Sequence, residues 1–153
     1  PIKINIMDKT FILSKIIDEY QKMVANLKSS VDHYKRDSDI DEDNTLDPDD
    51  YARQNEAKDM QLRFEKMLSQ AQQNLKFLED AKTDGKEKAE IGALIETDKN
   101  YLFIGVSVPV FKLGDKEVIS FSEDAPIFKS VKNKKIGDIF EIGKNKFEIK
   151  QIN

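Results

Sequence analysis

The sequence predicts an α+β protein with two parts, a long antiparallel helical hairpin over residues 1–85 and a small, mostly antiparallel β domain over residues 86–153. Two observations predict this division. Apolar residues recur every three or four positions through the first half, as in paired helices, and from about residue 91 they recur every second position, as in strands. A strongly acidic segment at residues 37–50 separates the two helical patterns. It is predicted to form the tip of the hairpin.

The first predicted helix begins near Asp8 or Thr10 and ends near Arg36. Its apolar or small residues follow the 3/4 spacing of a coiled-coil seam: Leu13, Ile16, Tyr20, Met23, Leu27, Ser30 and Tyr34, with Ile17, Val24 and Val31 widening the stripe. A helix of this length extends roughly 40 Å. Because an isolated amphipathic helix is only marginally stable in water, this one requires a partner.

The second predicted helix provides that partner. Asp47 is positioned to cap the free backbone N–H groups, Pro48 suits the first helical position, and Asp49 and Asp50 lie at the positive end of the helix dipole. The seam again has 3/4 spacing: Ala57, Met60, Phe64, Met67, Ala71, Asn74 and Leu78, widened by Leu68 and Leu75. The helix is expected to end near Ala81. A short loop between two helices of similar length makes an antiparallel hairpin.

The second half is predicted to be mainly strands. Strands are expected at residues 91–97, 101–111, 117–121, 139–142 and 146–152. A short helix is expected at residues 124–131, with Asp124 as a possible cap and Pro126 in its first turn. Gly143 to Asn145 separates the last two strands, which are therefore expected to form a hairpin.

Composition excludes several kinds of site. The chain has no Cys and one His, His33, so it can form no disulfide or thiolate metal site, and a Ser-His-Asp triad is hard to build. No run of 18 or more apolar residues exists, and charges lie near the start where a signal peptide needs an apolar core. The expectation is a cytoplasmic monomer without a membrane partner. The net charge of −4 argues against a protein that grips a nucleic-acid backbone by itself.

The acidic segment carries eight carboxylates within fourteen residues. They are Asp37, Asp39, Asp41, Glu42, Asp43, Asp47, Asp49 and Asp50. Crowded like charges repel and add nothing to the stability of a bare turn. At the end of a rigid support they indicate a cation or a basic partner, and a plain solvated loop is the alternative interpretation.

A calcium loop is a second interpretation of the same residues. Asp39, Asp41 and Asp43 would occupy positions 1, 3 and 5 of a twelve-residue calcium loop, and Asp47 and Asp50 would occupy positions 9 and 12. Asn44 stands where that loop usually has Gly, and an Asp stands where it usually has a bidentate Glu. The coiled-coil seams on both sides disfavour the splayed helices of an EF-hand. The alternative function is a calcium-binding helical-hairpin interaction module.

The second half resembles the C-terminal domain of the bacterial Gre family of transcript cleavage factors. The residues that carry the resemblance are Ile119-Ser120, Ala125-Pro126-Ile127, the run Lys134-Lys-Ile-Gly-Asp138, the opening Ile91-Gly-Ala-Leu-Ile, and the closing hairpin that ends at Ile152. The first half is similar to the family in plan, as a helical hairpin with an acidic tip, and residues 49–53 are similar to the Glu-Tyr-x-x-x-Arg that follows the family's tip. The resemblance is most specific over residues 117–142. Ala125 departs from the family's usual Ser, and the tip is longer and more acidic than the family's.

This resemblance implies an FKBP-like fold for the β domain and a regulator of bacterial RNA polymerase that is not itself an enzyme. In the family, the hairpin enters the secondary channel, and tip carboxylates help hold a Mg²⁺ shared with the polymerase, beside the nascent RNA. By position, Asp43 and Asp47 are the nearest counterparts of the family's tip residues, then Asp41, and with less support Asp39, Glu42, Asp49 and Asp50.

The resemblance further implies that Ser120, Ala125, Pro126 and Ile127 contact the polymerase. Stimulation of cleavage and inhibition of the polymerase both remain open. A prolyl isomerase, which the FKBP-like fold alone would suggest, is disfavoured because the sequence shows no evident aromatic-lined pocket.

Overall fold

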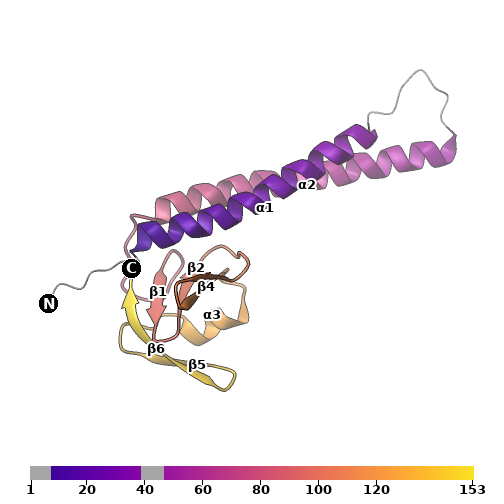
Figure 1. Ribbon diagram of the computed structural model, residues 1–153. Coiled ribbons are helices and arrows are strands. Elements are labelled where there is room, and N and C mark those ends of the chain that lie inside the picture. The colour runs from indigo at the N-terminus through magenta and orange to yellow at the C-terminus, as the bar shows by residue number, and fades with distance from the viewer. Residues whose placement is uncertain (1–7, 39–46) are drawn as a thin grey trace. The chain divides into compact units, whose positions relative to one another are not determined.

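The structure, a computed structural model, describes residues 8–38 and 47–153 and is α+β, as predicted (Figure 1). Its elements are α1 (Lys9–Ser38), α2 (Pro48–Ala81), β1 (Leu94–Thr97), β2 (Asn100–Ile104), β3 (Phe111–Leu113), β4 (Lys116–Phe121), α3 (Pro126–Val131), β5 (Ile139–Ile142) and β6 (Asn145–Ile152). The chain divides into two compact units. One contains the described part of residues 1–19 with residues 76–153, and the other contains the described part of residues 20–75.

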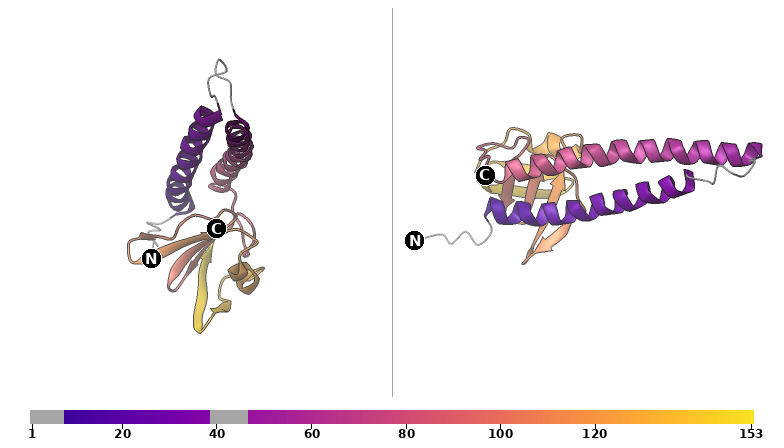
Figure 2. Two further views of the ribbon diagram at one scale, coloured as in Figure 1. Left: turned by 90° about the vertical axis from the view of Figure 1, so that its right-hand side faces the viewer. Right: turned by 90° about the horizontal axis from the view of Figure 1, so that it is seen from above.

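Both long helices begin and end close to their predicted positions. Asp8 caps α1, because its Oδ1 accepts a hydrogen bond of 2.8 Å from the backbone N–H of Phe11. Pro48 is the first residue of α2, and Ala81 is the last. The two helices run side by side in opposite directions (Figures 1 and 2). Within the second unit, the amide of Asn74 donates a hydrogen bond of 2.9 Å to the hydroxyl of Tyr20, which joins them.

The buried stripe of each helix differs in part from the predicted seam. Met23 and Met67, both assigned to the seam, are 38% and 47% exposed. Val31 is buried and Leu68 is half-buried, although both were assigned to the margin of the stripe. Neighbouring residues of a helix point about 100° apart, so only one of each adjacent pair can face the partner fully. The 3/4 spacing was right, but the choice between adjacent positions was wrong at Met23 and Met67.

The six strands form one mixed sheet in the order β3-β4-β2-β1-β6-β5. Four neighbouring pairs are antiparallel, and β2 and β4 are parallel. The strand predicted at residues 101–111 is two strands, because the chain leaves β2 after Ile104 and enters β3 only at Phe111. Gly105, with φ of 153°, marks the break, and Pro109 lacks the N–H that a continuing strand would need.

The start of α3 differs from the prediction in its cap, whereas the last hairpin agrees with the prediction. Asp124 does not cap α3: Ala125 is the N-cap residue and makes no side-chain cap hydrogen bond. Pro126 stands in the first turn as predicted. The β5–β6 hairpin is confirmed, with Ile142 opposite Asn145. Gly143 adopts φ of 61°, the conformation that the first turn residue of a tight hairpin requires.

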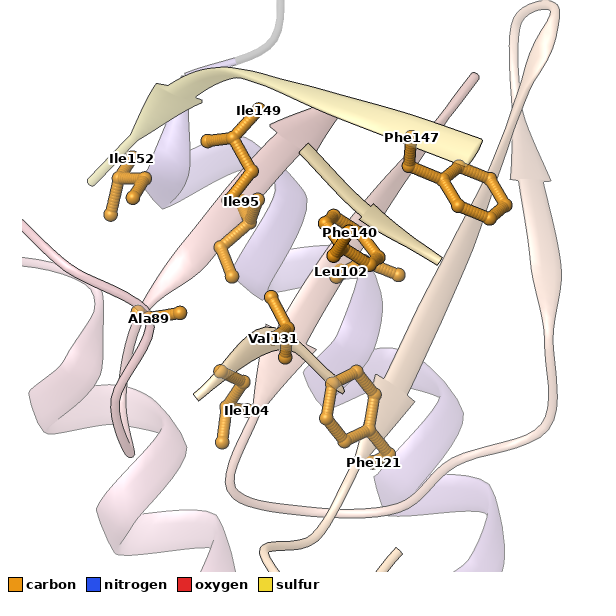
Figure 3. Packing of buried hydrophobic residues seen from close by; sticks show 11 residues of the cluster. Ala89, Ile95, Leu102, Ile104, Phe121, Val131, Phe140, Phe147, Ile149 and Ile152 are labelled. Atoms are coloured by element: carbon orange, nitrogen blue, oxygen red, sulfur yellow. The ribbon is translucent and has the colours of Figure 1, made fainter. Parts of the chain in front are cut away.

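The core of the β domain lies between the sheet and α3 (Figure 3). The buried side chains come from the linker, four strands of the central sheet, β5 and α3: Ala89, Ala93, Ile95, Leu102, Ile104, Phe121, Val131, Phe140, Phe147, Ile149 and Ile152. Because side chains alternate along a strand, Phe103 points to the opposite face from Leu102 and Ile104. There its ring meets that of Phe77 of α2, with centroids 6.2 Å apart. Strand β2 is therefore covered on both faces.

A buried lysine ties the start of α1 to the segment that leads into the sheet. The Nζ of Lys9 donates hydrogen bonds of 2.7 Å to the carbonyl of Asp84 and 2.8 Å to the carbonyl of Gly92, and the residue is only 7% exposed. Desolvation by burial lowers its pKa from 10.5 to about 8, against the raising effect of the Asp84 carboxylate and with a small lowering effect of Lys86. The contact is polar, specific and electrostatically costly.

We expect Gly105→Ala to destabilise the protein. A Cβ at this position would lie 2.5 Å from Cε2 of Phe77, and φ of 153° is rarely adopted by residues with a side chain. The two effects together should lower the free energy of unfolding by about 1–3 kcal/mol. Thermal unfolding followed by circular dichroism checks this. Gly85→Ala is the matched control, because a Cβ there meets nothing within 4 Å. Equal melting temperatures for the two variants would contradict the expectation.

We expect Lys9→Met to destabilise the protein by about 1–3 kcal/mol at pH 7, because the buried carbonyl of Gly92 and the partly buried carbonyl of Asp84 lose their donor. The difference in free energy of unfolding between the wild type and the variant should widen as the pH rises from about 8 to 10.5. Over that range the unfolded chain still holds the Lys9 proton, whereas the folded chain has released it, so rising pH stabilises the wild type. Urea unfolding of both proteins at several pH values measures the gap. A gap that narrows across this range would contradict the burial of an ammonium group.

Candidate functional site

The acidic segment is only partly described by the structure. Four of its predicted metal ligands, Asp39, Asp41, Glu42 and Asp43, lie outside the described residues. Asp47, Asp49 and Asp50 lie within them. Asp47 and Asp49 are exposed, and Asp50 is half-buried. The segment therefore joins the end of α1 to the first turn of α2, and its last three carboxylates stand at that turn.

Asp47 and Asp50 cap α2 reciprocally. The backbone N–H of Asp50 donates a hydrogen bond of 2.8 Å to Oδ1 of Asp47, and the backbone N–H of Asp47 donates one of 3.4 Å to Oδ2 of Asp50. This is the arrangement of a capping box, with Asp in place of the usual Glu or Gln at the third position. The predicted cap at Asp47 is confirmed. Asp50 adds the second half of the box.

Asp50 also pairs with a cation of its own helix. The guanidinium of Arg53 donates a hydrogen bond to Oδ1 of Asp50, one turn away. Arg53 and the backbone N–H of Asp47 hold the pKa of the Asp50 carboxyl below its usual value. Asp50 therefore stays ionised at neutral pH and loses these bonds only when the pH falls below its usual titration range.

The described carboxylates do not by themselves make a metal site. In residues 8–38 and 47–153, no three groups of the His, Cys, Asp or Glu kind converge as ligands. Both oxygens of Asp50 and one oxygen of Asp47 already accept hydrogen bonds. Asp49 is exposed and makes no such bond in the described part of the chain. A cation held here would need ligands from residues 39–46 or from a partner.

The four residues expected to contact a partner differ in accessibility. Ser120 is 3% exposed, and its hydroxyl donates a hydrogen bond to the carbonyl of Val106, so it fixes the 105–108 loop from within. Ala125 and Ile127 are half-buried and pack against the core of the β domain. Pro126 is exposed. Of the four, Pro126 therefore offers the most surface to another molecule.

An open polar depression of about 340 Å³ lies beside the linker, lined by Gly85, Lys86, Glu87, Lys88, Glu90 and Lys135. Lys86 is already paired with Asp84 at 3.1 Å and with Glu90 at 3.7 Å. No lining residue is aromatic or has a large apolar side chain, whereas pockets for small molecules are mostly apolar. Its residues give this depression no catalytic character.

Two features, one in each compact unit, were not predicted from the sequence. The Asp47-x-x-Asp50 spacing, followed by Arg53, carried the signal for a reciprocal cap with an ion pair, but only the cap at Asp47 was predicted. The burial of Lys9 had no sequence signal, because a lysine at the start of an amphipathic helix usually lies in water.

We expect Asp47→Ala and Asp47→Asn to differ in their effect on α2. Asparagine accepts the same capping hydrogen bond and should preserve the first turn, whereas alanine should destabilise it by about 1 kcal/mol. Amide hydrogen exchange at Asp50 and Tyr51 should accelerate in the alanine variant and change little in the asparagine variant. Equal exchange rates in the two variants would show that the cap contributes nothing.

In the described ranges, no helix has the length and apolar character needed to cross a membrane. No protein-family model matches the chain, and no curated protein or solved structure matches it significantly.

Proposed function

We propose that this protein regulates transcription elongation by binding bacterial RNA polymerase, as the resemblance to the Gre family implies. The observation that supports this best is the combination of two long paired helices, joined by a carboxylate-rich segment, with a six-stranded sheet region that carries the family-like residues 117–142. We further propose that the β domain is FKBP-like and that the helices form a coiled coil.

The lengths of the helices support the proposed reach. α1 has 30 residues and α2 has 34, which correspond to about 45 and 51 Å. The acidic segment follows α1 and precedes α2 in the chain, and its described carboxylates Asp47, Asp49 and Asp50 stand at the start of α2. A carboxylate cluster at the end of such a support could enter the secondary channel of the polymerase while the β domain stays outside.

The proposed role of the acidic segment is to supply oxygen ligands near the polymerase active site. A Mg²⁺ held there would clamp the attacking and leaving oxygens of phosphoryl chemistry. Mg²⁺ commonly takes only one or two protein carboxylates, with water and phosphate oxygens completing its shell. Of the described groups, we propose Asp49 and the second carboxylate oxygen of Asp47 as ligands. Asp41 and Asp43, the other proposed ligands, lie outside the described residues.

The β domain is proposed to dock through the start of α3. Pro126 is exposed and Ile127 is half-buried beside it, so this turn presents an apolar contact. Ser120 would act indirectly by holding the neighbouring loop through Val106. The calcium-module alternative is less well supported, because Asp50, which would have to be its bidentate ligand, is already bonded by Arg53 and by the backbone of Asp47.

We expect Asp43→Asn combined with Asp47→Asn to separate binding from activity. Asparagine at position 47 still accepts the capping hydrogen bond, so the variant should fold as the wild type does. The two substitutions remove the negative charges of two proposed ligands. The effect of the double variant on the rate of transcript cleavage or of nucleotide addition by backtracked elongation complexes should be smaller than that of the wild type by about tenfold or more. A tenfold change in rate corresponds to about 1.4 kcal/mol in activation free energy. Co-sedimentation with bacterial RNA polymerase should show affinity unchanged within about twofold.

Asp18→Asn combined with Asp59→Asn is the matched control, because it removes two exposed carboxylates from the helices outside the acidic segment. It should keep full activity.

Pro126→Glu should weaken co-sedimentation with the polymerase, while its circular dichroism spectrum remains that of the wild type. Failure of the wild-type protein to bind polymerase or to alter elongation would overturn the proposal, and submicromolar Ca²⁺ affinity by calorimetry would favour the calcium module.

A further inference from the structure

The outer edge of the sheet at β5 has no further strand beside it in the described part of the chain. β5 is the last strand in the sheet order, and among residues 8–38 and 47–153 its one pairing partner is β6, so it lies at the edge of the sheet in Figure 1. A strand at this position presents a row of backbone groups on its far side. The orientation of β6 determines which groups these are.

The backbone groups of Glu148 point away from β5. Its carbonyl accepts a hydrogen bond of 3.1 Å from the N–H of Asp98, and its N–H donates one of 3.0 Å to Oδ1 of Asp98. Ile139 stands opposite Glu148, so the pair is not hydrogen-bonded, and both backbone groups of Ile139 face outward. The backbone groups of Glu141 also face outward. Its opposite residue on β6 is Lys146, whose carbonyl points away from β5 and accepts a hydrogen bond of 2.6 Å from Nζ of Lys99.

The side chains along this edge are unusually apolar for an exposed position. Ile139 is 59% exposed, and Ile136, just before the strand, is 56% exposed. Natural sheets commonly protect free edges with charged side chains, with Pro or with a bulge. β5 presents an isoleucine at one of its two outward-facing positions, Ile139, and a charged residue at the other, Glu141.

Positive charge surrounds the apolar edge. Residues 132–146 carry five lysines and two carboxylates, although the whole chain has a net charge of −4. The lysines are Lys132, Lys134, Lys135, Lys144 and Lys146, and all but the half-buried Lys134 are exposed. The edge is therefore aliphatic at Ile139, carries the Glu141 carboxylate, which pairs with Lys146 at 3.7 Å, and is flanked by lysines on both sides.

We propose that β5 binds an extended segment of another protein, rich in aliphatic and acidic residues, which adds to the sheet as a further strand. Main-chain hydrogen bonds to Ile139 and Glu141 would hold it, aliphatic side chains would cover Ile136 and Ile139, and carboxylates would meet the flanking lysines. This inference uses a different surface from the acidic segment and does not depend on binding to polymerase.

Charge and composition select this partner over two others. A second copy paired through the same edge in antiparallel register would bring the lysines before β5 against those after it, which is repulsive. Nucleic acid is disfavoured because residues 132–147 contain no arginine, and their aromatic side chains, Phe140 and Phe147, are buried. Single-stranded nucleic acids are usually held by exposed aromatic side chains that stack on bases.

The test uses a nine-residue peptide that alternates valine with aspartate and glutamate, titrated into the ¹⁵N-labelled full chain. We expect NMR shifts centred on β5 and at least about tenfold slower amide exchange at Ile139 and Glu141 at saturation. The same peptide N-methylated at every residue, which removes all of its backbone N–H donors, should bind at least about tenfold more weakly. Equal binding of the two peptides, or shifts confined to other elements, would overturn the proposal.

Variants separate the edge from general charge attraction. Ile139→Pro removes the outward N–H at a position where an edge strand tolerates proline, and it should abolish peptide binding. Lys134→Gln combined with Lys135→Gln keeps the fold and should weaken binding by about tenfold. Lys112→Gln, on the opposite edge strand β3, is the matched control and should bind as the wild type does. Wild-type binding by the Ile139→Pro variant would refute strand addition.

Two further outcomes would identify a different partner and overturn the proposal. One is sedimentation of the free protein as a dimer that Ile139→Pro dissociates. The other is tighter binding of a twelve-nucleotide single-stranded oligonucleotide than of the peptide, with shifts at the same residues.

Discussion

The burial of β2 on both faces is the constraint on which the organisation of the sheet-bearing unit depends. All five of its residues are buried, and alternation sends Leu102 and Ile104 toward α3 while Phe103 faces Phe77 of α2. A strand in the middle of a sheet needs cover on both sides when both of its faces are apolar. The short α3 covers one face. The ends of the long helices supply apolar cover on the other, so they belong to the same compact unit as the sheet.

Two details of that unit follow from the same requirement. Gly105 has no side chain, which lets the chain turn away from β2 directly against the ring of Phe77. Lys9 satisfies the carbonyls of Asp84 and Gly92, which the approach of α1 removes from water. The buried ammonium is unfavourable in itself, as its lowered pKa records, but the two carbonyls would be left without a donor in its absence.

The acidic segment joins a structural and a proposed functional use of the same residues. Asp47 and Asp50 start α2 by satisfying each other's backbone N–H groups, and Arg53 keeps Asp50 ionised. Because the carboxylates of Asp47 and Asp50 accept these hydrogen bonds, they have fewer lone pairs left to bind a cation. Any metal role therefore falls more heavily on Asp49, on one oxygen of Asp47 and on residues 39–46. The cationic, aliphatic edge at β5 is chemically the opposite of this segment, so the two surfaces suit different partners.

The sequence by itself determined the class of the fold, the limits of the long helices and the last hairpin. These features depend on local chemistry: the caps at Asp8 and Asp47, Pro48 at the first helical position, the change of hydrophobic period, and Gly143 in a two-residue turn. Tertiary structure decided which adjacent residues of each helix are buried, as at Met67 and Leu68, because spacing alone does not choose between neighbours. It also decided that residues 101–111 divide into a central and an edge strand, that Ser120 lies inside, that Lys9 is buried, and that Ile139 faces outward. Each of these depends on contacts between segments far apart in the chain, which local sequence patterns do not encode.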